Sequence, residues 1–138
     1  MIIIDTNILS ELMKPEPENK VLDWFQRYAA ASLFTTTVTE AEILYGVALL
    51  PNSKRRTALE KAVKGLFEED FFERVLSFDR AAAQCYAMIV ADRRQIGRPI
   101  SQFDAQIAAI AHSRGAAIAT RNDFDFGDCH IEVINPWN

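Results

Sequence analysis

Short apolar runs recur along the chain and are separated by longer, mixed stretches. Ile2-Ile3-Ile4 is apolar on every side, which is typical of a parallel strand buried on both faces. The other short runs contain alanine, valine, isoleucine, phenylalanine and threonine, and turn residues bound several of them. Strands are therefore expected at residues 2–4, 32–38, 73–78, 116–120 and 131–136.

The longer stretches place apolar residues at the three- and four-residue spacing of a helix. Val63, Leu66 and Phe67, for example, fall on one stripe. Asp79 is a predicted N-cap and Gly97 a predicted helix end. Helices are expected at residues 6–13, 19–30, 39–50, 54–71, 79–97 and 101–115.

This alternation of strands and helices predicts an α/β fold. A strand that returns to the same sheet through a helix pairs in parallel, so the sheet should be mostly parallel with helices on both faces. The chain has 138 residues, a length that fits one domain with one main core. Because no linker, repeat or low-complexity segment is visible, we expect a single domain over residues 1–138.

The charge balance restricts the partners that this chain can attract. The formal net charge is −4 and the pI is about 5.2, so a nucleic acid would need a local basic patch or bound cations. Two cysteines, Cys85 and Cys129, make neither a disulfide framework nor a zinc site. The sequence shows no signal peptide, and no apolar run approaches about 18 residues. We therefore expect a cytoplasmic protein that does not contact membranes.

Carboxylates follow several of the predicted strands. Asp5 comes directly after the first strand, and Glu42 lies less than two helical turns after the second. Asp104 falls in the first turn of the last long helix, while Asp123 and Asp125 follow residues 116–120. Ligands of open parallel sheets bind outside the carboxyl ends of the strands. The sequence therefore predicts an acidic cluster at this edge of the sheet.

Each of these acids also has a structural interpretation. Asp5 can cap the helix that follows it, and Thr39 with Glu42 fits a capping box. Ser101 with Asp104 is a looser version of the same pattern. Asp123 and Asp125 are common turn residues. Capping and metal binding do not exclude each other, and the convergence of several acids favours a functional site.

Clustered carboxylates repel one another, and a hard divalent cation removes that repulsion. Mg²⁺ prefers oxygen ligands and is usually held by one or two protein carboxylates together with waters and substrate phosphates. A bound cation of this kind activates water and neutralises charge on a phosphodiester transition state. The predicted cofactor is therefore Mg²⁺ or Mn²⁺.

Five motifs follow one another along the chain: MIIIDTNILSEL, VTEAEILYGVA, FDAQIAAIA, IATRN and VINPW. In this order and spacing they resemble the PIN-domain ribonucleases, and in particular the VapC-type toxins with their FitB-like subgroup. The resemblance covers nearly the whole chain. It implies a three-layer α/β/α sandwich on a central parallel sheet and a metal-dependent endoribonuclease that acts as the toxin of a type II toxin–antitoxin pair. It also implies a homodimer, an RNA substrate, inhibition by a small cognate antitoxin, and DNA bound only through that antitoxin.

The resemblance also implies roles for single residues. Asp5, Glu42 and Asp104 match the family's acids, with Asp5 and Asp104 as the main metal ligands. The stretch TRNDFDF fits a TRNxxDF pattern, which assigns the fourth acid to Asp125 and keeps Asp123 in reserve. If that stretch is extended, Phe124 and Phe126 should share the face toward the core. Supporting polar residues are expected at Thr6, Thr120 and Asn122.

Two other interpretations remain open at this stage. A phosphatase of the haloacid-dehalogenase type also has an aspartate after its first strand, but Asn7 stands where its second aspartate would be. A catalytically silent PIN-fold module would act only as a corepressor with its antitoxin. The dense basic groups are expected to be solvated helix faces, with contact to the RNA backbone as the alternative. These groups comprise Lys54, Arg55, Arg56, Arg93, Arg94 and Arg98.

Overall fold

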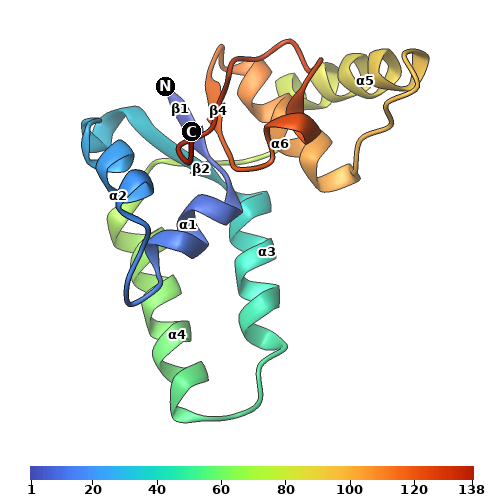
Figure 1. Cartoon of the computed structure of the whole chain (residues 1–138). Coiled ribbons are helices and arrows are strands. Elements are labelled where there is room, and N and C mark those ends of the chain that lie inside the picture. The colour runs from blue at the N-terminus through green and yellow to red at the C-terminus, as the bar shows by residue number, and fades with distance from the viewer.

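The computed structural model describes residues 1–138 and contains one sheet of five strands, all parallel (Figure 1). The strand order is β3-β2-β1-β4-β5, so the first strand lies at the centre. The predicted strands are all present, although each except the first is shorter than expected. Their bounds are β1 Ile2–Ile4, β2 Leu33–Thr36, β3 Val75–Leu76, β4 Ala117–Ala119 and β5 Val133–Ile134.

Six α-helices connect these strands and confirm the predicted alternation. Three short helical turns add to them: η1 (Ala30–Ser32), the π-helical η2 (Leu66–Asp70) that continues α4, and η3 (Asp123–Phe126). None of the helices is long and apolar enough to cross a membrane. The α-helices are α1 Thr6–Leu12, α2 Asn19–Gln26, α3 Thr37–Ala48, α4 Lys54–Gly65, α5 Arg80–Gln95 and α6 Gln102–Ser113.

The alternation of side chains in β1 divides the core into two halves. Ile3 packs on one face of the sheet in a cluster that includes buried residues of α5 and α6. Ile2 and Ile4 pack on the opposite face with residues of α1, α2, α3 and α4. All three isoleucines are buried. The central strand is therefore covered by helices on both sides, as the apolar run predicted.

Helices α3 and α4 form an arm that extends away from the sheet. They run side by side, and the loop that joins them lies at the far end of the arm (Figure 1). Ser53 caps α4 there by accepting a hydrogen bond from the backbone N–H of Arg56. The basic residues 54–56 therefore start at the end of the arm that points away from the strands.

The predicted boundaries of α5 and α6 are confirmed by the residues at their ends. The Asp79 side chain accepts from the backbone N–H of Ala82 at the start of α5. Gly97 and Gly115, which follow α5 and α6, have φ angles of 73° and 61°. A side chain is unfavourable in that left-handed conformation, so glycine allows the chain to leave both helices sharply.

Candidate active site

The strand order has a switch point beside β1. From β1 the chain first adds β2 and β3 on one side, and later β4 and β5 on the other. Ligands of open α/β sheets bind outside the carboxyl ends of the strands at such a switch point. Asp5 follows β1 and Thr120 follows β4, and the Asp5 backbone N–H donates to the carbonyl of Ala119 at 3.0 Å. These two side chains therefore stand where a ligand is expected.

Asp5 is buried, with 4% of its surface exposed, and its carboxylate is held by neutral donors. One oxygen accepts from the backbone N–H of Thr6 at 2.8 Å, which caps α1 as predicted. The other oxygen accepts from the Thr120 hydroxyl at 2.8 Å and from the Asn7 amide at 3.2 Å. None of the ion pairs in the structure includes Asp5. A buried carboxylate without a cationic partner is costly, which favours a cation at this position.

Asn7 is a site residue that the sequence-based assignment missed. Its amide nitrogen donates to Asp5 and also to the Thr120 hydroxyl at 3.2 Å, while its oxygen accepts from the backbone N–H of Arg121 at 2.9 Å. Asn7 therefore connects the ends of β1 and β4. Its place in the triplet Asp5-Thr6-Asn7, directly after a buried strand, was the available indication.

Glu42 comes to this site from α3, which begins earlier than expected. Thr36 is the N-cap and its side chain accepts from the backbone N–H of Thr39, so the predicted capping box of Thr39 and Glu42 is wrong. Glu42 lies in the second helical turn, where its carboxylate is not needed for capping. It accepts instead from the Thr6 hydroxyl at 3.1 Å.

Asp104 comes from a third segment, the first turn of α6. The Ser101 side chain caps this helix by accepting from the Asp104 backbone N–H at 3.2 Å, as the sequence predicted. Asp5, Glu42 and Asp104 thus come from three separate segments and act on one another electrostatically. Burial raises the pKa of Asp104 and of Glu42; the charges of Asp5 and Asp125 raise that of Asp104 further, and the charges of Asp5 and Asp104 raise that of Glu42 further.

Asp125 approaches the other acids from η3. Residues 123–126 form a 3-10 turn, so the expectation of an extended segment is wrong. Phe126 is buried as expected, but Phe124 is 77% exposed and points away from the core. The Asp125 charge contributes to the raised pKa values of both Asp5 and Asp104, whereas Asp123 is absent from their causes. This difference favours Asp125 as the fourth acid.

Burial and mutual repulsion both act against ionisation of the acids. Burial is the largest cause that raises the pKa of Asp5, Glu42 and Asp104, and the neighbouring carboxylates raise it further. Hydrogen bonds from Thr120, Thr6 and Ser101 partly offset this effect. A cation at this site would favour the ionised forms, because opposite charge stabilises a carboxylate.

The donor set suits a hard cation that keeps part of its water shell. As the side chains stand, no three acidic, histidine or cysteine groups come close enough to one point to hold a metal ion together. Mg²⁺ needs only one or two direct carboxylates, with waters at its remaining positions.

The three expected supporting residues take part in the site in different ways. Thr6 and Thr120 donate their hydroxyl groups to Glu42 and Asp5, as their expected role requires. Asn122 contributes its backbone N–H, which donates to the Thr120 hydroxyl at 3.0 Å. The network therefore fixes the acids through short polar side chains and backbone groups, which lose little conformational entropy.

Arg93 is not available for RNA, so the predicted contact is wrong for this residue. It is only 3% exposed, and its guanidinium donates to the carbonyls of Arg98, Asp125 and Gly127. Arg98 is half-buried and pairs with Asp128, while Arg94 is exposed on α5. Lys54, Arg55 and Arg56 lie at the far end of the arm, away from the sheet (Figure 1).

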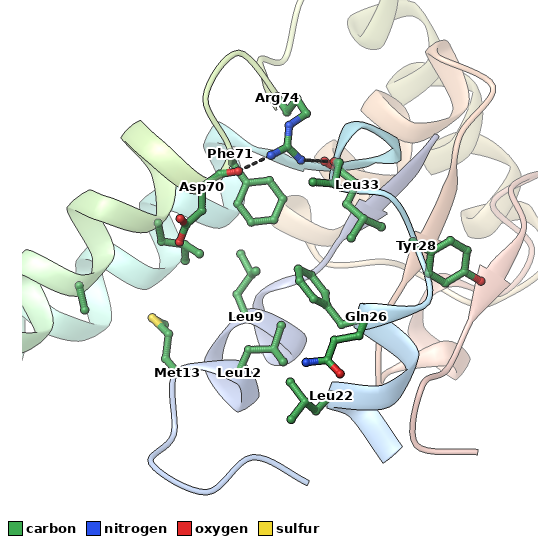
Figure 2. Close-up of a pocket in the computed structure, with 14 residues that line it drawn as sticks. Leu9, Leu12, Met13, Leu22, Gln26, Tyr28, Leu33, Asp70, Phe71 and Arg74 are labelled. Carbon is green, nitrogen blue, oxygen red and sulfur yellow. Dashed lines mark hydrogen bonds between the residues drawn. The ribbon is translucent and has the colours of Figure 1, made fainter. Parts of the chain in front are cut away.

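A separate apolar groove of about 670 Å³ lies between α1, α2, β2 and the end of α4. Figure 2 shows Leu9, Leu12 and Leu22 pointing into the same space, with Arg74 at its rim donating to the carbonyls of Leu33 and Asp70. Helix α1 begins next to Asp5 and lines the groove with its last turn. Leu12 of the groove therefore lies about 10 Å from Asp5 along this helix.

Comparison with known proteins identifies the family of the chain. The family model described as PIN domain matches residues 2–129. The chain belongs to the PIN-domain family. VapC ribonuclease Y4jK of Sinorhizobium fredii is 37% identical to this PIN domain over 99% of the chain and 98% of the relative. Toxin FitB of Neisseria gonorrhoeae is 33% identical over 100% of the chain and 99% of the relative.

A solved structure of FitAB bound to an IR36 DNA fragment has the same fold. It shares 33% identity with this PIN domain, covers 100% of this chain and 96% of the other, and superposes with a TM-score of 0.94. The predicted α/β/α fold and the resemblance to VapC- and FitB-type proteins are thereby confirmed. The interpretation as a haloacid-dehalogenase phosphatase is wrong, because the chain belongs to the PIN-domain family.

Proposed function

We propose that this PIN domain is the toxin of a type II toxin–antitoxin pair and an endoribonuclease that depends on Mg²⁺ or Mn²⁺. The observation that carries the proposal is the buried Asp5 at the switch point, with no basic side chain paired to it and with three further acids near it. Two relatives at 33–37% identity, Toxin FitB and VapC ribonuclease Y4jK, support it.

Asp5 and Asp104 are the proposed direct ligands, and Glu42 and Asp125 complete the pocket directly or through water. A divalent cation in such a site lowers the pKa of its water and neutralises charge on the phosphodiester. The chain's own contribution is orientation. Thr120 and Asn7 hold Asp5 from the β4 side, and Thr6 holds Glu42, so both carboxylates keep their direction before substrate arrives.

A catalytically silent corepressor is the alternative function. It would not need these acids at one site, where burial and repulsion oppose the ionisation of Asp5, Glu42 and Asp104 and raise their pKa values. A protein that serves only as a scaffold would gain nothing from a buried carboxylate at Asp5 that no basic side chain pairs with. The intact acidic set therefore favours catalysis.

A substrate panel tests the proposed activity. Purified protein without partner is incubated with single-stranded RNA, duplex DNA and a phosphate monoester, each with Mg²⁺, with Mn²⁺ or with chelator. The proposal predicts RNA fragments only, and only with the cation. Hydrolysis of the monoester would indicate a phosphatase, and inactivity on every substrate by a folded protein would favour the corepressor.

The proposed partner is a small DNA-binding antitoxin, and DNA is bound only through it. The solved FitAB structure, which contains a DNA fragment, supports this assignment. We further propose that the toxin acts in the cytoplasm as a homodimer. An acidic chain with a net charge of −4 attracts DNA poorly by itself, which agrees with binding through a partner.

The apolar groove beside α1 is the proposed docking site for the antitoxin. Eleven of its fourteen lining residues are hydrophobic, so an apolar segment of a partner fits it. A basic side chain about 10 Å further along α1 would then reach Asp5. A guanidinium pairs with a carboxylate through two hydrogen bonds, so this contact would occupy the position of the cation and block activity.

A further inference from the structure

Phe124 is the most exposed large hydrophobic residue of the molecule. Its exposed fraction is 77%, and it precedes Asp125, the fourth acid of the site. Single exposed hydrophobic residues are common on protein surfaces and by themselves indicate nothing. Phe124 differs from such residues because the surrounding structure holds both its ring and its backbone in place.

Arg98 fixes the ring from one side. Its guanidinium carbon lies 4.4 Å from the centre of the Phe124 ring, and its side chain donates to the Phe124 carbonyl and to Asp128. Arg93 holds the backbone of the turn, because it donates to the carbonyls of Asp125 and Gly127 at 2.8 and 3.0 Å. The ring is therefore presented by a braced turn, with the guanidinium stacked against it.

The surroundings of Phe124 favour a nucleobase over a protein surface as its occupant. Residues 121–125 are all exposed, and Phe124 is the only apolar one among them. A protein partner would bury a continuous apolar patch, which this turn does not offer. A base needs only an aromatic face, often with a guanidinium beside it, and unpaired bases are recognised in this way.

Because Phe124 is next to Asp125, a base stacked on its ring would lie close to the acids. We propose that the Phe124 ring, braced by Arg98, is a stacking platform for one unpaired base of the RNA, next to the phosphodiester that the acids cleave. This inference rests on the proposed ribonuclease function. Stacking at one fixed distance from the acids places the scissile bond and restricts cleavage to strands whose bases are free to stack.

Two measurements on the full chain test the platform. Cleavage of a short single-stranded RNA with Mn²⁺ gives kcat and KM, and fluorescence anisotropy gives the affinity for the same RNA without cleavage, in chelator. Phe124→Ala should raise KM and weaken binding at least about fivefold, with little change in kcat. Phe124→Trp should restore both values. Phe72→Ala is the matched control, because Phe72 is 65% exposed but precedes β3 at the opposite edge of the sheet.

A set of RNAs with one abasic nucleotide at successive positions identifies the stacking itself. At one position the missing base should weaken binding to the wild type and remove the difference between wild type and Phe124→Ala. Equal binding by both proteins to the intact RNA, or a constant difference at every abasic position, would overturn the platform. An effect of Phe124→Ala on self-association or antitoxin binding alone would assign the ring to a protein interface instead.

Failure of the proposed function can be distinguished from failure of the platform. If the wild type binds RNA through Phe124 but cuts no RNA with any cation, the ribonuclease proposal fails and the platform remains. If it cuts RNA with unchanged KM in Phe124→Ala, only the platform fails. If it neither binds nor cuts RNA, both fail.

Discussion

At the scale of single residues, the acids oppose folding when no cation is present. Burial and the charges of Asp5 and Asp125 raise the pKa of Asp104. A raised folded-state pKa contributes stability that is fully present below the unfolded pKa and is lost as the pH rises through the folded value. Asp104→Asn should therefore raise the melting temperature of metal-free protein at pH 7, and this gain should disappear near pH 3. Thermal melts of both proteins in chelator at the two pH values measure this, and an equal shift at both would exclude an electrostatic cause.

The same scale distinguishes the two aspartates of η3. Asp125 acts on the pKa values of Asp5 and Asp104 and Asp123 does not, so Asp125→Ala should lower turnover by about ten- to a hundredfold. Asp123→Ala should leave turnover near that of the wild type. Asp5→Ala should be more damaging than either, because a direct ligand is harder to replace than one acting through water. Cleavage rates at saturating Mn²⁺ give this order, and a larger loss in Asp123→Ala would reverse the assignment.

At the scale of elements, one buried guanidinium joins α5, the loop before α6 and η3. Arg93→Met would remove three partly buried hydrogen bonds, to the carbonyls of Arg98, Asp125 and Gly127, and each such bond contributes about 0.5–1.5 kcal/mol. We expect unfolding in urea at a clearly lower midpoint, with a loss of roughly 3 kcal/mol. Arg94→Met, on the exposed neighbouring position, is the control and should change the free energy of unfolding little. Equal losses in both variants would contradict a specific role of Arg93.

The elements also show how far the sequence could predict the site. The apolar run of β1 and the acid after it required only local information, and both were predicted. Arg93 looked like a solvated residue because its partners, the carbonyls of Asp125 and Gly127, are more than thirty positions away and are joined to it only by the fold. The η3 turn was missed for a related reason. Burial of Phe126 and the hydrogen bonds from Arg93 determine its conformation, and the alternation of apolar residues along the sequence reveals neither.

At the scale of the whole molecule, the groove and the acids should be coupled through the antitoxin. Leu12→Asp places a charge in the groove and should abolish antitoxin binding while RNA cleavage by the free toxin is retained. Leu49→Asp, directly after α3 at a position that is 66% exposed and outside the groove, should leave antitoxin binding intact. Titration of Mn²⁺ into wild-type toxin with and without saturating antitoxin completes the test. Unchanged Mn²⁺ affinity would mean that the partner inhibits without occupying the cation position.

The central claim is that the acids of β1, α3, α6 and η3 form one cation site for RNA cleavage. The most direct test is the cleavage rate of single-stranded RNA by Asp104→Asn and by the wild type at saturating Mn²⁺, with circular dichroism to verify the fold. Asparagine keeps the size of the side chain and removes its charge. The account predicts a native spectrum with activity reduced at least about a hundredfold. A native spectrum with full activity would contradict it.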